Sequence, residues 1–173
     1  MTPLEIQSFI VDVPDFPKPG IVFKDITPLL ASPAAFRAVI DVLAERSAGL
    51  EADGILAIES RGFIFGAALA QRLGLPLQLV RKRGKLPRAA ITVRYELEYG
   101  FDQLEVHTDA ITEGARYLIV DDVIATGGTA AAVAQLVAQR GAIVAACVFL
   151  LELTFLHGRA KLDGLDIVSL ISY

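Results

Sequence analysis

The 173-residue sequence contains one cysteine, Cys147, and two histidines, His107 and His157. A lone cysteine cannot form an intramolecular disulfide, and its place inside an apolar run fits a reducing cytoplasm. A zinc site, or a serine or cysteine nucleophile activated by histidine, needs more of these residues than the chain provides. We therefore expect neither kind of site.

Long apolar runs are also missing. No run approaches the roughly 20 residues that span a bilayer, and the first residues, MTPLEIQSF, lack the basic and apolar regions of a signal peptide. We expect a cytoplasmic protein with no membrane partner. The mean hydropathy of +0.53 is high for such a protein, which points to apolar surface that an oligomer interface covers.

Basic residues are in the minority. Sixteen lysines and arginines against 20 aspartates and glutamates give a net charge of −4, which argues against a general nucleic-acid partner. Neither G-x-x-x-x-G-K-[ST] nor G-x-G-x-x-G occurs, which disfavours P-loop NTPases and Rossmann dehydrogenases. No repeat, linker or low-complexity segment divides the chain, so its length predicts a single domain over residues 1–173.

The most informative stretch is YLIVDDVIATGGT, at residues 117–129. A short apolar strand ends in Asp121 and Asp122, and the chain turns through Gly127 and Gly128 into an alanine-rich helix. The glycines let backbone N–H groups converge on an anion at the positive end of that helix. The carboxylates suit the hydroxyls of a ribose or the outer shell of a magnesium ion. The pattern predicts a ribose 5-phosphate site, although receiver domains and nucleotide folds share its outline.

Two further strands deliver basic residues to the same predicted sheet edge. Residues 54–58 form a buried strand that leads through Glu59, Ser60 and Arg61 into a helix over residues 63–73. Residues 76–80 form the next strand and run into the basic segment RKRGK at residues 81–85. Because parallel strands bring their carboxyl ends together, we expect these cations to face one anionic ligand.

The predicted fold is α/β, with a doubly wound, mostly parallel central sheet flanked by helices. Residues 1–30 predict a helix to about Val11 and then a proline-rich extended arm that forms a small hood. Phe23 on this arm has a flat face that could meet a planar base. Residues 83–107 alternate apolar and polar side chains around Gly100, which predicts a flexible β-hairpin flap, able to act as a lid.

Six stretches, in the order FPKPGIVFKDITPLL, ESRGFIFG, RKRGKLP, YELEYG, VDDVIATGGT and LELTFLHGR, resemble the adenine-using members of the type I purine phosphoribosyltransferases. The resemblance implies transfer of the phosphoribosyl group of phosphoribosyl pyrophosphate (PRPP) to adenine, which gives AMP and pyrophosphate in purine salvage. It also implies a homodimer and Mg²⁺ that is held mainly by PRPP, with no direct protein ligand.

The resemblance assigns roles to individual residues. Phe23 and Leu153 would sandwich adenine, and the backbone near Lys24 would read its edge. Glu98 is the candidate for proton transfer and Tyr99 for flap closure. Asp121 and Asp122 would hold the ribose, and the 5-phosphate would be wrapped by Ala125, Thr126, Gly127, Gly128 and Thr129. Pyrophosphate would be bound by Ser60, Arg61, Arg81, Lys82 and Lys85, with Arg61 also counted as catalytic.

Two details of the resemblance concern single positions. It implies a non-proline cis peptide between Glu59 and Ser60, and it allows Lys85 to serve the neighbouring subunit. Many members have arginine where this chain has Lys24, so a contact that needs a planar guanidinium would be lost.

Two alternatives stay open on the sequence. A phosphoribosyltransferase for hypoxanthine, guanine or xanthine would share the PRPP loop and differ in the pocket around Phe23, Lys24 and Leu153. A non-catalytic regulator that senses PRPP would normally carry an added nucleic-acid-binding element, and neither an extra domain nor a basic face is visible.

Overall fold

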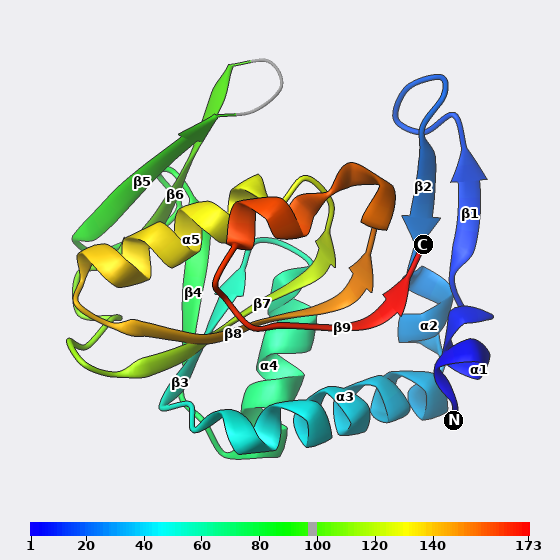
Figure 1. The fold of residues 1–173 in the computed structure, drawn as a ribbon, viewed down its shortest axis with the longest axis horizontal. Helices are drawn as coiled ribbons and strands as arrows, with labels where there is room; N and C mark the ends of the chain where they lie inside the picture. Colours follow the sequence, from blue (N-terminus) through cyan, green and yellow to red (C-terminus); the bar gives the residue numbers. More distant parts are fainter. Residues whose placement is uncertain (97–99) are drawn as a thin grey trace.

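The computed structural model describes residues 1–96 and 100–173 of the chain. Its centre is a seven-stranded sheet in the order β5-β6-β4-β3-β7-β8-β9 (Figure 1). The strands of this sheet are β3 (Gly54–Ile58), β4 (Leu77–Lys82), β5 (Ala90–Glu96), β6 (Phe101–His107), β7 (Arg116–Ile124), β8 (Ile143–Glu152) and β9 (Ile167–Ser172). Strands β4, β3, β7, β8 and β9 run parallel, while β6 and β5 extend the sheet antiparallel at one edge. The predicted α/β class with a mostly parallel sheet is confirmed.

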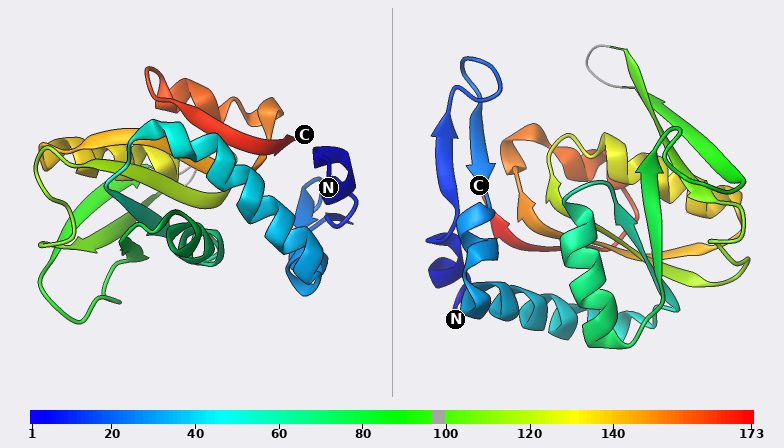
Figure 2. Two further views of the ribbon diagram at one scale, coloured as in Figure 1. Left: turned by 90° about the horizontal axis from the view of Figure 1, so that it is seen from below. Right: turned by 180° about the vertical axis from the view of Figure 1, so that it is seen from behind.

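Helices cover both faces of the sheet. The long helices are α3 (Pro33–Ser47), α4 (Gly62–Leu73) and α5 (Gly128–Gln139), and the short ones are α1 (Pro3–Gln7), α2 (Thr27–Ala31), η1 (Ala48–Leu50), η2 (Thr154–Leu156) and η3 (Gly158–Leu162). Figures 1 and 2 place α5 on one face, with α3 and α4 on the other. Because both faces are covered, the central strands read as continuous apolar runs, as the sequence predicts.

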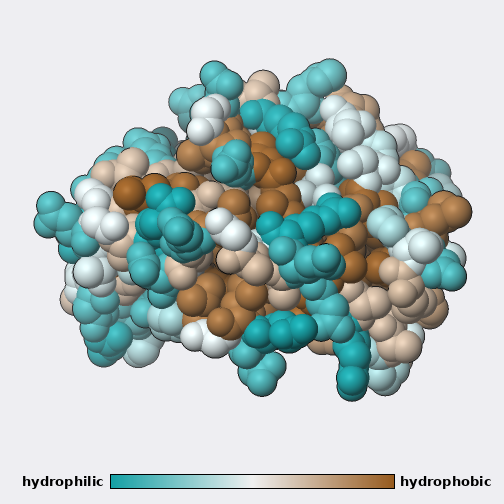
Figure 3. Space-filling model, turned by 60° about the horizontal axis from the view of Figure 1, so that its bottom comes forward, coloured by the Kyte–Doolittle hydropathy of each residue, from teal (hydrophilic) through white to brown (hydrophobic). Residues whose placement is uncertain are grey.

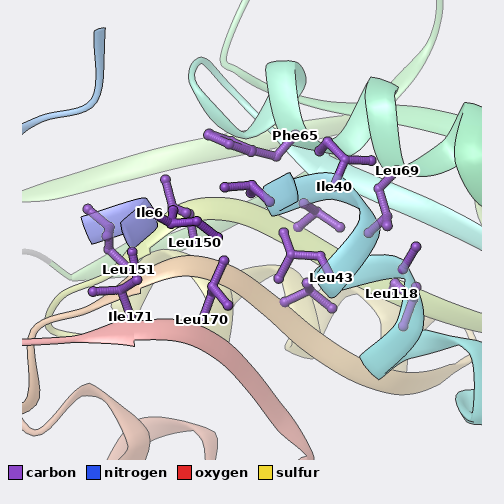
Figure 4. Close-up of a cluster of buried hydrophobic side chains, with 14 of the residues drawn as sticks. Ile6, Ile40, Leu43, Phe65, Leu69, Leu118, Leu150, Leu151, Leu170 and Ile171 are labelled. Carbon is purple, nitrogen blue, oxygen red and sulfur yellow. The ribbon is translucent and has the colours of Figure 1, made fainter. Parts of the chain in front are cut away.

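The two faces bury separate clusters of apolar side chains. Alternate residues of β7 serve each cluster, so Leu118 packs toward α3 and α4 while Ile119 packs toward α5. In Figure 4 the first cluster joins Leu43 of α3 and Phe65 of α4 to Leu150 of β8. These side chains are 0% exposed, and burying each one stabilises the fold by about 1.5 to 3 kcal/mol. The sheet edge that carries the predicted site therefore stands on a dense core.

The N-terminal arm is more ordered than an extended chain. Helix α1 begins with a capping box formed by Thr2 and Glu5, but it ends at Gln7 and not near Val11 as predicted. Strands β1 (Val11–Pro14) and β2 (Val22–Asp25) then pair antiparallel. A two-stranded pairing satisfies the backbone groups that the prolines keep out of a helix. Figure 1 shows this hairpin beside the C-terminus.

Strand β7 runs further than the apolar residues alone indicate. Asp121 and Asp122 lie inside the strand, which continues to Ile124 because β8 keeps pairing with it as far as Ile124 opposite Glu152. The carboxylates are therefore fixed by a sheet ladder and not by a loop. Other element ends differ from the sequence prediction by one or two residues, and Arg81 and Lys82 belong to strand β4.

Candidate active site

A cavity of about 640 Å³ opens at the carboxyl ends of β3, β4 and β7. The predicted residues that line it are Ser60, Arg61, Lys82, Lys85, Asp121, Asp122, Ala125, Thr126, Gly127, Gly128 and Thr129. Crevices at this edge of parallel sheets are where α/β proteins bind ligands. The fold thus gathers around one cavity the residues that the sequence assigns to ribose, 5-phosphate and pyrophosphate.

The turn between β7 and α5 has the geometry of an anion site. Gly127 takes φ +77° as the residue before the helix, and no side chain of the described residues caps this helix end. The backbone N–H groups of the first turn therefore stay available to a ligand at the positive end of the helix dipole.

A second glycine supports this turn from behind. A Cβ atom on Gly158 would lie 2.3 Å from the Ala125 carbonyl oxygen and 3.1 Å from the Gly127 nitrogen. Only glycine allows the backbone of η3 to approach so closely. The η3 segment is held in place by Arg159, whose Nε and Nη2 donate to the Glu152 carboxylate at 2.6 and 2.7 Å.

The two aspartates form a tight, buried pair. The Asp122 backbone N–H donates to Asp121 Oδ1 at 2.8 Å, and Arg61 Nε lies 2.9 Å from Asp122 Oδ2. Burial and then the charge of Asp122 raise the pKa of Asp121 well above its ordinary value. Burial also raises the pKa of Asp122, although the Arg61 charge opposes this. The pair is electrostatically costly without a ligand, which is typical of functional carboxylates.

The raised pKa of Asp121 sets the sign of a pH effect. The folded protein holds this proton more tightly than the unfolded chain does, so the slope of stability against pH is negative between the two pKa values. The stabilisation is present below the unfolded value and is lost as pH rises through the raised folded value. Burial of Asp121 therefore costs the ligand-free fold more stability as the pH rises above the unfolded pKa of this carboxyl group.

The loop after β3 brings Arg61 to the aspartates. The Glu59–Ser60 peptide bond is cis, as the family resemblance implies. A Cβ atom on Gly62 would lie 2.9 Å from Asp121 Oδ1 and 2.7 Å from the Val120 carbonyl oxygen. Glycine at this position lets the start of α4 pack directly against β7.

The basic run 81–85 folds around Glu59. Arg81 Nε lies 3.3 Å from Glu59 Oε2, the Lys82 backbone N–H donates to the same oxygen at 3.0 Å, and Lys85 Nζ contacts Oε1. Lys82 Nζ lies 3.4 Å from Asp102. Lys82 and Lys85 line the cavity, whereas Arg81 does not. Within this single chain, Lys85 pairs with a carboxylate of its own subunit.

The predicted base-binding residues lie outside this cavity. Phe23 is half-buried on β2, and the Arg61 guanidinium lies 5.1 Å from its ring. Leu153 follows β8, and its N–H donates to the Ile124 carbonyl at 3.0 Å. Lys24 Nζ pairs with Asp12 at 2.7 Å and lies 3.8 Å from the Tyr173 ring.

Glu98 and Tyr99 lie outside the described residues. Nearby, Tyr95 at the end of β5 lines the cavity, and its hydroxyl is 3.4 Å from Asp102 Oδ2. Tyr95, Glu59 and Gly158 are the site residues that sequence reasoning missed. All three stand inside matched stretches, Glu59 in ESRGFIFG, Tyr95 in YELEYG and Gly158 in LELTFLHGR, so position in those stretches was the available signal.

Comparison with known proteins agrees with this geometry. Residues 25–167 match the phosphoribosyl transferase domain family. An adenine phosphoribosyltransferase of a Thermoanaerobacter strain is 56% identical over 173 residues, with all of both chains covered. The crystal structure of adenine phosphoribosyltransferase from Thermoanaerobacter pseudethanolicus superposes with a TM-score of 0.97 at 55% identity, covering 99% of this chain and 100% of that one. The Saccharomyces cerevisiae enzyme, solved with an imino-altritol bisphosphate and adenine, gives 0.91 at 41% identity, with 97% of each chain covered.

The match over residues 25–167, on a parallel sheet with a glycine turn and a buried acidic pair at its carboxyl edge, defines this chain as a phosphoribosyltransferase, a glycosyltransferase by reaction. The full-length similarity is more specific. The chain belongs to the adenine phosphoribosyltransferase family, which converts adenine and PRPP to AMP in purine salvage.

Proposed function

We propose that the cavity binds PRPP in one defined orientation and transfers its phosphoribosyl group to adenine. The observation that supports this most directly is the shared cavity of Gly127, Asp121 and Arg61. The turn at Gly127 receives the 5-phosphate, the aspartates accept hydrogen bonds from the ribose hydroxyls, and the cations meet the pyrophosphate. This order matches the order of groups along PRPP.

The bond from ribose C1 to pyrophosphate breaks, and a bond from C1 to adenine N9 forms. The transition state has oxocarbenium character on the ribose. The Asp121 and Asp122 pair fixes the ring, while Arg61, Lys82 and Lys85 stabilise the charge on the departing pyrophosphate. Phe23 and Leu153 hold adenine from two sides. The Lys24 backbone reads the edge of the base, because the Lys24 side chain is turned to Asp12 and Tyr173.

Mg²⁺ fits this site as a partner of PRPP. The carboxylates that line the cavity offer hard oxygen donors, but Glu59 is occupied by cations and Asp122 by Arg61. Among the described residues no group of three or more metal-ligating side chains comes together. The ion would neutralise charge on the pyrophosphate, with PRPP oxygens as most of its ligands and the aspartates in outer contact.

Glu98 is proposed to take the proton that adenine loses, with Tyr99 and the flap, residues 83–107, closing the site against water. Glu98→Gln keeps the side-chain shape and removes its basicity. We expect turnover to fall by roughly 10²- to 10⁴-fold, with little change in PRPP affinity. Single-turnover AMP formation measures this, and an unchanged rate would assign the proton to a backbone group or water.

We also infer a cytoplasmic homodimer. Large apolar side chains reach the surface, among them Leu4 at 77% and Phe155 at 63% exposure, and Figure 3 shows apolar side chains between hydrophilic ones on the face it presents. Cys147 is buried, which raises its pKa to about 12 and fits a thiol that stays reduced. No described helix has both the length and the apolar character of a membrane span. Sedimentation velocity of the purified chain tests the dimer.

The direct test of function is AMP formation from adenine, PRPP and Mg²⁺, run beside hypoxanthine and guanine. We expect AMP from adenine and at most a trace of product from the other two bases. Turnover of hypoxanthine or guanine at a comparable rate would make the protein a phosphoribosyltransferase for another base. PRPP binding without turnover of any base would make it a sensor.

A further inference from the structure

Glu59 places a negative charge in a cavity that is proposed to bind an anion. Its side chain is 8% exposed at the end of β3 and lines the cavity beside Ser60 and Arg61. Three donors converge on it, namely Lys85 Nζ on Oε1, with Arg81 Nε and the Lys82 backbone N–H on Oε2. The carboxylate thus holds the basic run that the proposed function gives to pyrophosphate.

These contacts close a ring. Arg81 Nη1 donates to the Lys85 carbonyl at 3.1 Å, so one guanidinium links Glu59 to the far end of the same loop. On the other side of the loop, the Gly84 N–H donates to Glu105 Oε2 at 2.9 Å. Burial opposes ionisation of Glu59, but the bonds from Lys85 and Lys82 and the charges of Lys85 and Arg81 outweigh it, and its pKa lies below the ordinary value. Glu59 is therefore an anion at neutral pH.

The Glu59 carboxylate and a bound pyrophosphate would compete for the ammonium group of Lys85. The Lys85 side chain is 48% exposed in spite of the Glu59 contact, so a pyrophosphate oxygen in the cavity can reach it. Pyrophosphate in the cavity would also be repelled by the nearby carboxylate, because like charges at short range oppose one another even in a screened medium.

We propose that Glu59 is the internal counter-anion of the pyrophosphate subsite. Glu59 pairs with Lys85 while the subsite is empty, and this ion pair breaks when pyrophosphate binds Lys85. Glu59 is therefore a positioning residue that weakens pyrophosphate binding and speeds product release. This inference rests on the proposed function. A carboxylate that only ordered the loop would instead strengthen pyrophosphate binding.

The two roles give opposite signs in Glu59→Gln. The amide keeps the length of the side chain and an acceptor for the Lys82 N–H but loses the charge. We expect calorimetry with pyrophosphate and MgCl₂ to show about tenfold tighter binding, with a matching fall in the product-inhibition constant. The KM for adenine should not change, because the base side is untouched.

Three further variants locate the effect. Glu105→Gln removes a carboxylate that bonds the same loop, lies opposite Arg81 across the β4–β6 pair, and has no described ion pair with Lys85 or Arg81. It should leave pyrophosphate affinity within about twofold of the parent. Adding Lys85→Gln to Glu59→Gln should cancel most of the gain. Glu59→Asp keeps the charge but shortens its reach to Lys85, so its affinity should fall between the parent and Glu59→Gln even if the amide variant folds poorly.

Weaker or unchanged pyrophosphate binding in Glu59→Gln would overturn the inference, as would an equal gain in Glu105→Gln. Both the function and the inference are tested in one preparation. A parent protein that makes no AMP defeats the proposed function. A parent that makes AMP, beside variants that do not bind pyrophosphate more tightly, defeats only the role of Glu59.

Discussion

The residues proposed to bind PRPP, here called the PRPP side, and those proposed to bind adenine, here called the base side, come from different parts of the fold. The PRPP side lies on β3 and β7, the central strands, and its backbone turns are fixed by close contacts at Gly62 and Gly158. The base side comes from the arm hairpin and the end of β8, which meet near the C-terminus. The proposed anion subsite is therefore formed by the core, whereas the proposed adenine subsite depends on contacts between segments near the two ends of the chain.

The Arg61 side chain contacts both sides. Arg61 lies 2.9 Å from Asp122 Oδ2 and 5.1 Å from the centre of the Phe23 ring. We therefore expect changes on either side to act mainly on their own substrate, with Arg61 as the route by which one side influences the other. The following variants test that division.

The largest effect is expected on the PRPP side, from Asp121→Asn with Asp122→Asn. Two charge-assisted hydrogen bonds to the ribose hydroxyls contribute roughly 1.5 to 3 kcal/mol each, so PRPP affinity should fall by about 10²- to 10⁴-fold. Calorimetry with PRPP and MgCl₂ measures this. Unchanged affinity would remove the aspartates from the ribose site.

The same variant supplies its own control for folding. Because burial of the Asp121 carboxyl group raises its pKa and costs the ligand-free fold stability above the unfolded pKa, the double variant should melt at a higher temperature than the parent when no ligand is present. A lower melting temperature would mean that affinity was lost through damage to the fold.

Gly158→Ala should weaken the 5-phosphate turn without touching substrate. The new Cβ would lie 2.3 Å from the Ala125 carbonyl oxygen, and such overpacking costs typically 1 to 3 kcal/mol, so we expect PRPP affinity to fall about tenfold. Gly49→Ala is the matched control, since a Cβ there meets no atom within 4 Å. Equal behaviour of the two variants would show that η3 does not support the turn.

Phe23→Ala should act on adenine. Loss of a stacking face costs about 1 to 3 kcal/mol per base, so the KM for adenine should rise about tenfold in steady-state AMP synthesis. Phe23→Tyr keeps the ring and should stay near the parent. A KM that does not respond to loss of the ring would place adenine elsewhere.

Lys24→Met should have the smallest effect. It keeps the apolar stem but removes the ammonium that joins Asp12 to the Tyr173 ring, contacts that contribute about 0.5 to 1 kcal/mol. We expect kcat/KM for adenine to fall about two- to fivefold, with recovery in Lys24→Arg. Arg72→Met, which breaks the exposed pair with Asp41 on the far helices, should leave catalysis as it was.

Local patterns explain what could be predicted from the sequence. The alternation of apolar strands and helices defines the sheet, and the glycine turn after Asp121 and Asp122 defines the anion site within one short stretch. The pairing of Glu59 with Lys85 and the approach of Gly158 to Ala125 join residues 26 and 33 positions apart. Such contacts depend on how β3, β4, β7 and η3 pack, which no local pattern specifies.

The base side shows the same limit. The prolines of residues 14–19 exclude a helix, but they do not indicate that the arm folds into a hairpin or that it sits beside the C-terminus. The contact between the Lys24 ammonium group and the Tyr173 ring joins residues near opposite ends of the chain, so no local pattern indicates it. The division into two sides is therefore a result of the structure.

The central claim is that the PRPP side is formed before adenine arrives and does not depend on the base side. Calorimetric titration of PRPP with MgCl₂, without adenine, into the parent and into Phe23→Ala tests it most directly. We predict saturable binding in both, with dissociation constants within about threefold of each other, because Phe23 contacts the PRPP side through the partly exposed Arg61 side chain and not through the sheet. PRPP binding that requires adenine would contradict the claim. So would a loss of PRPP affinity in Phe23→Ala as large as the rise in its KM for adenine.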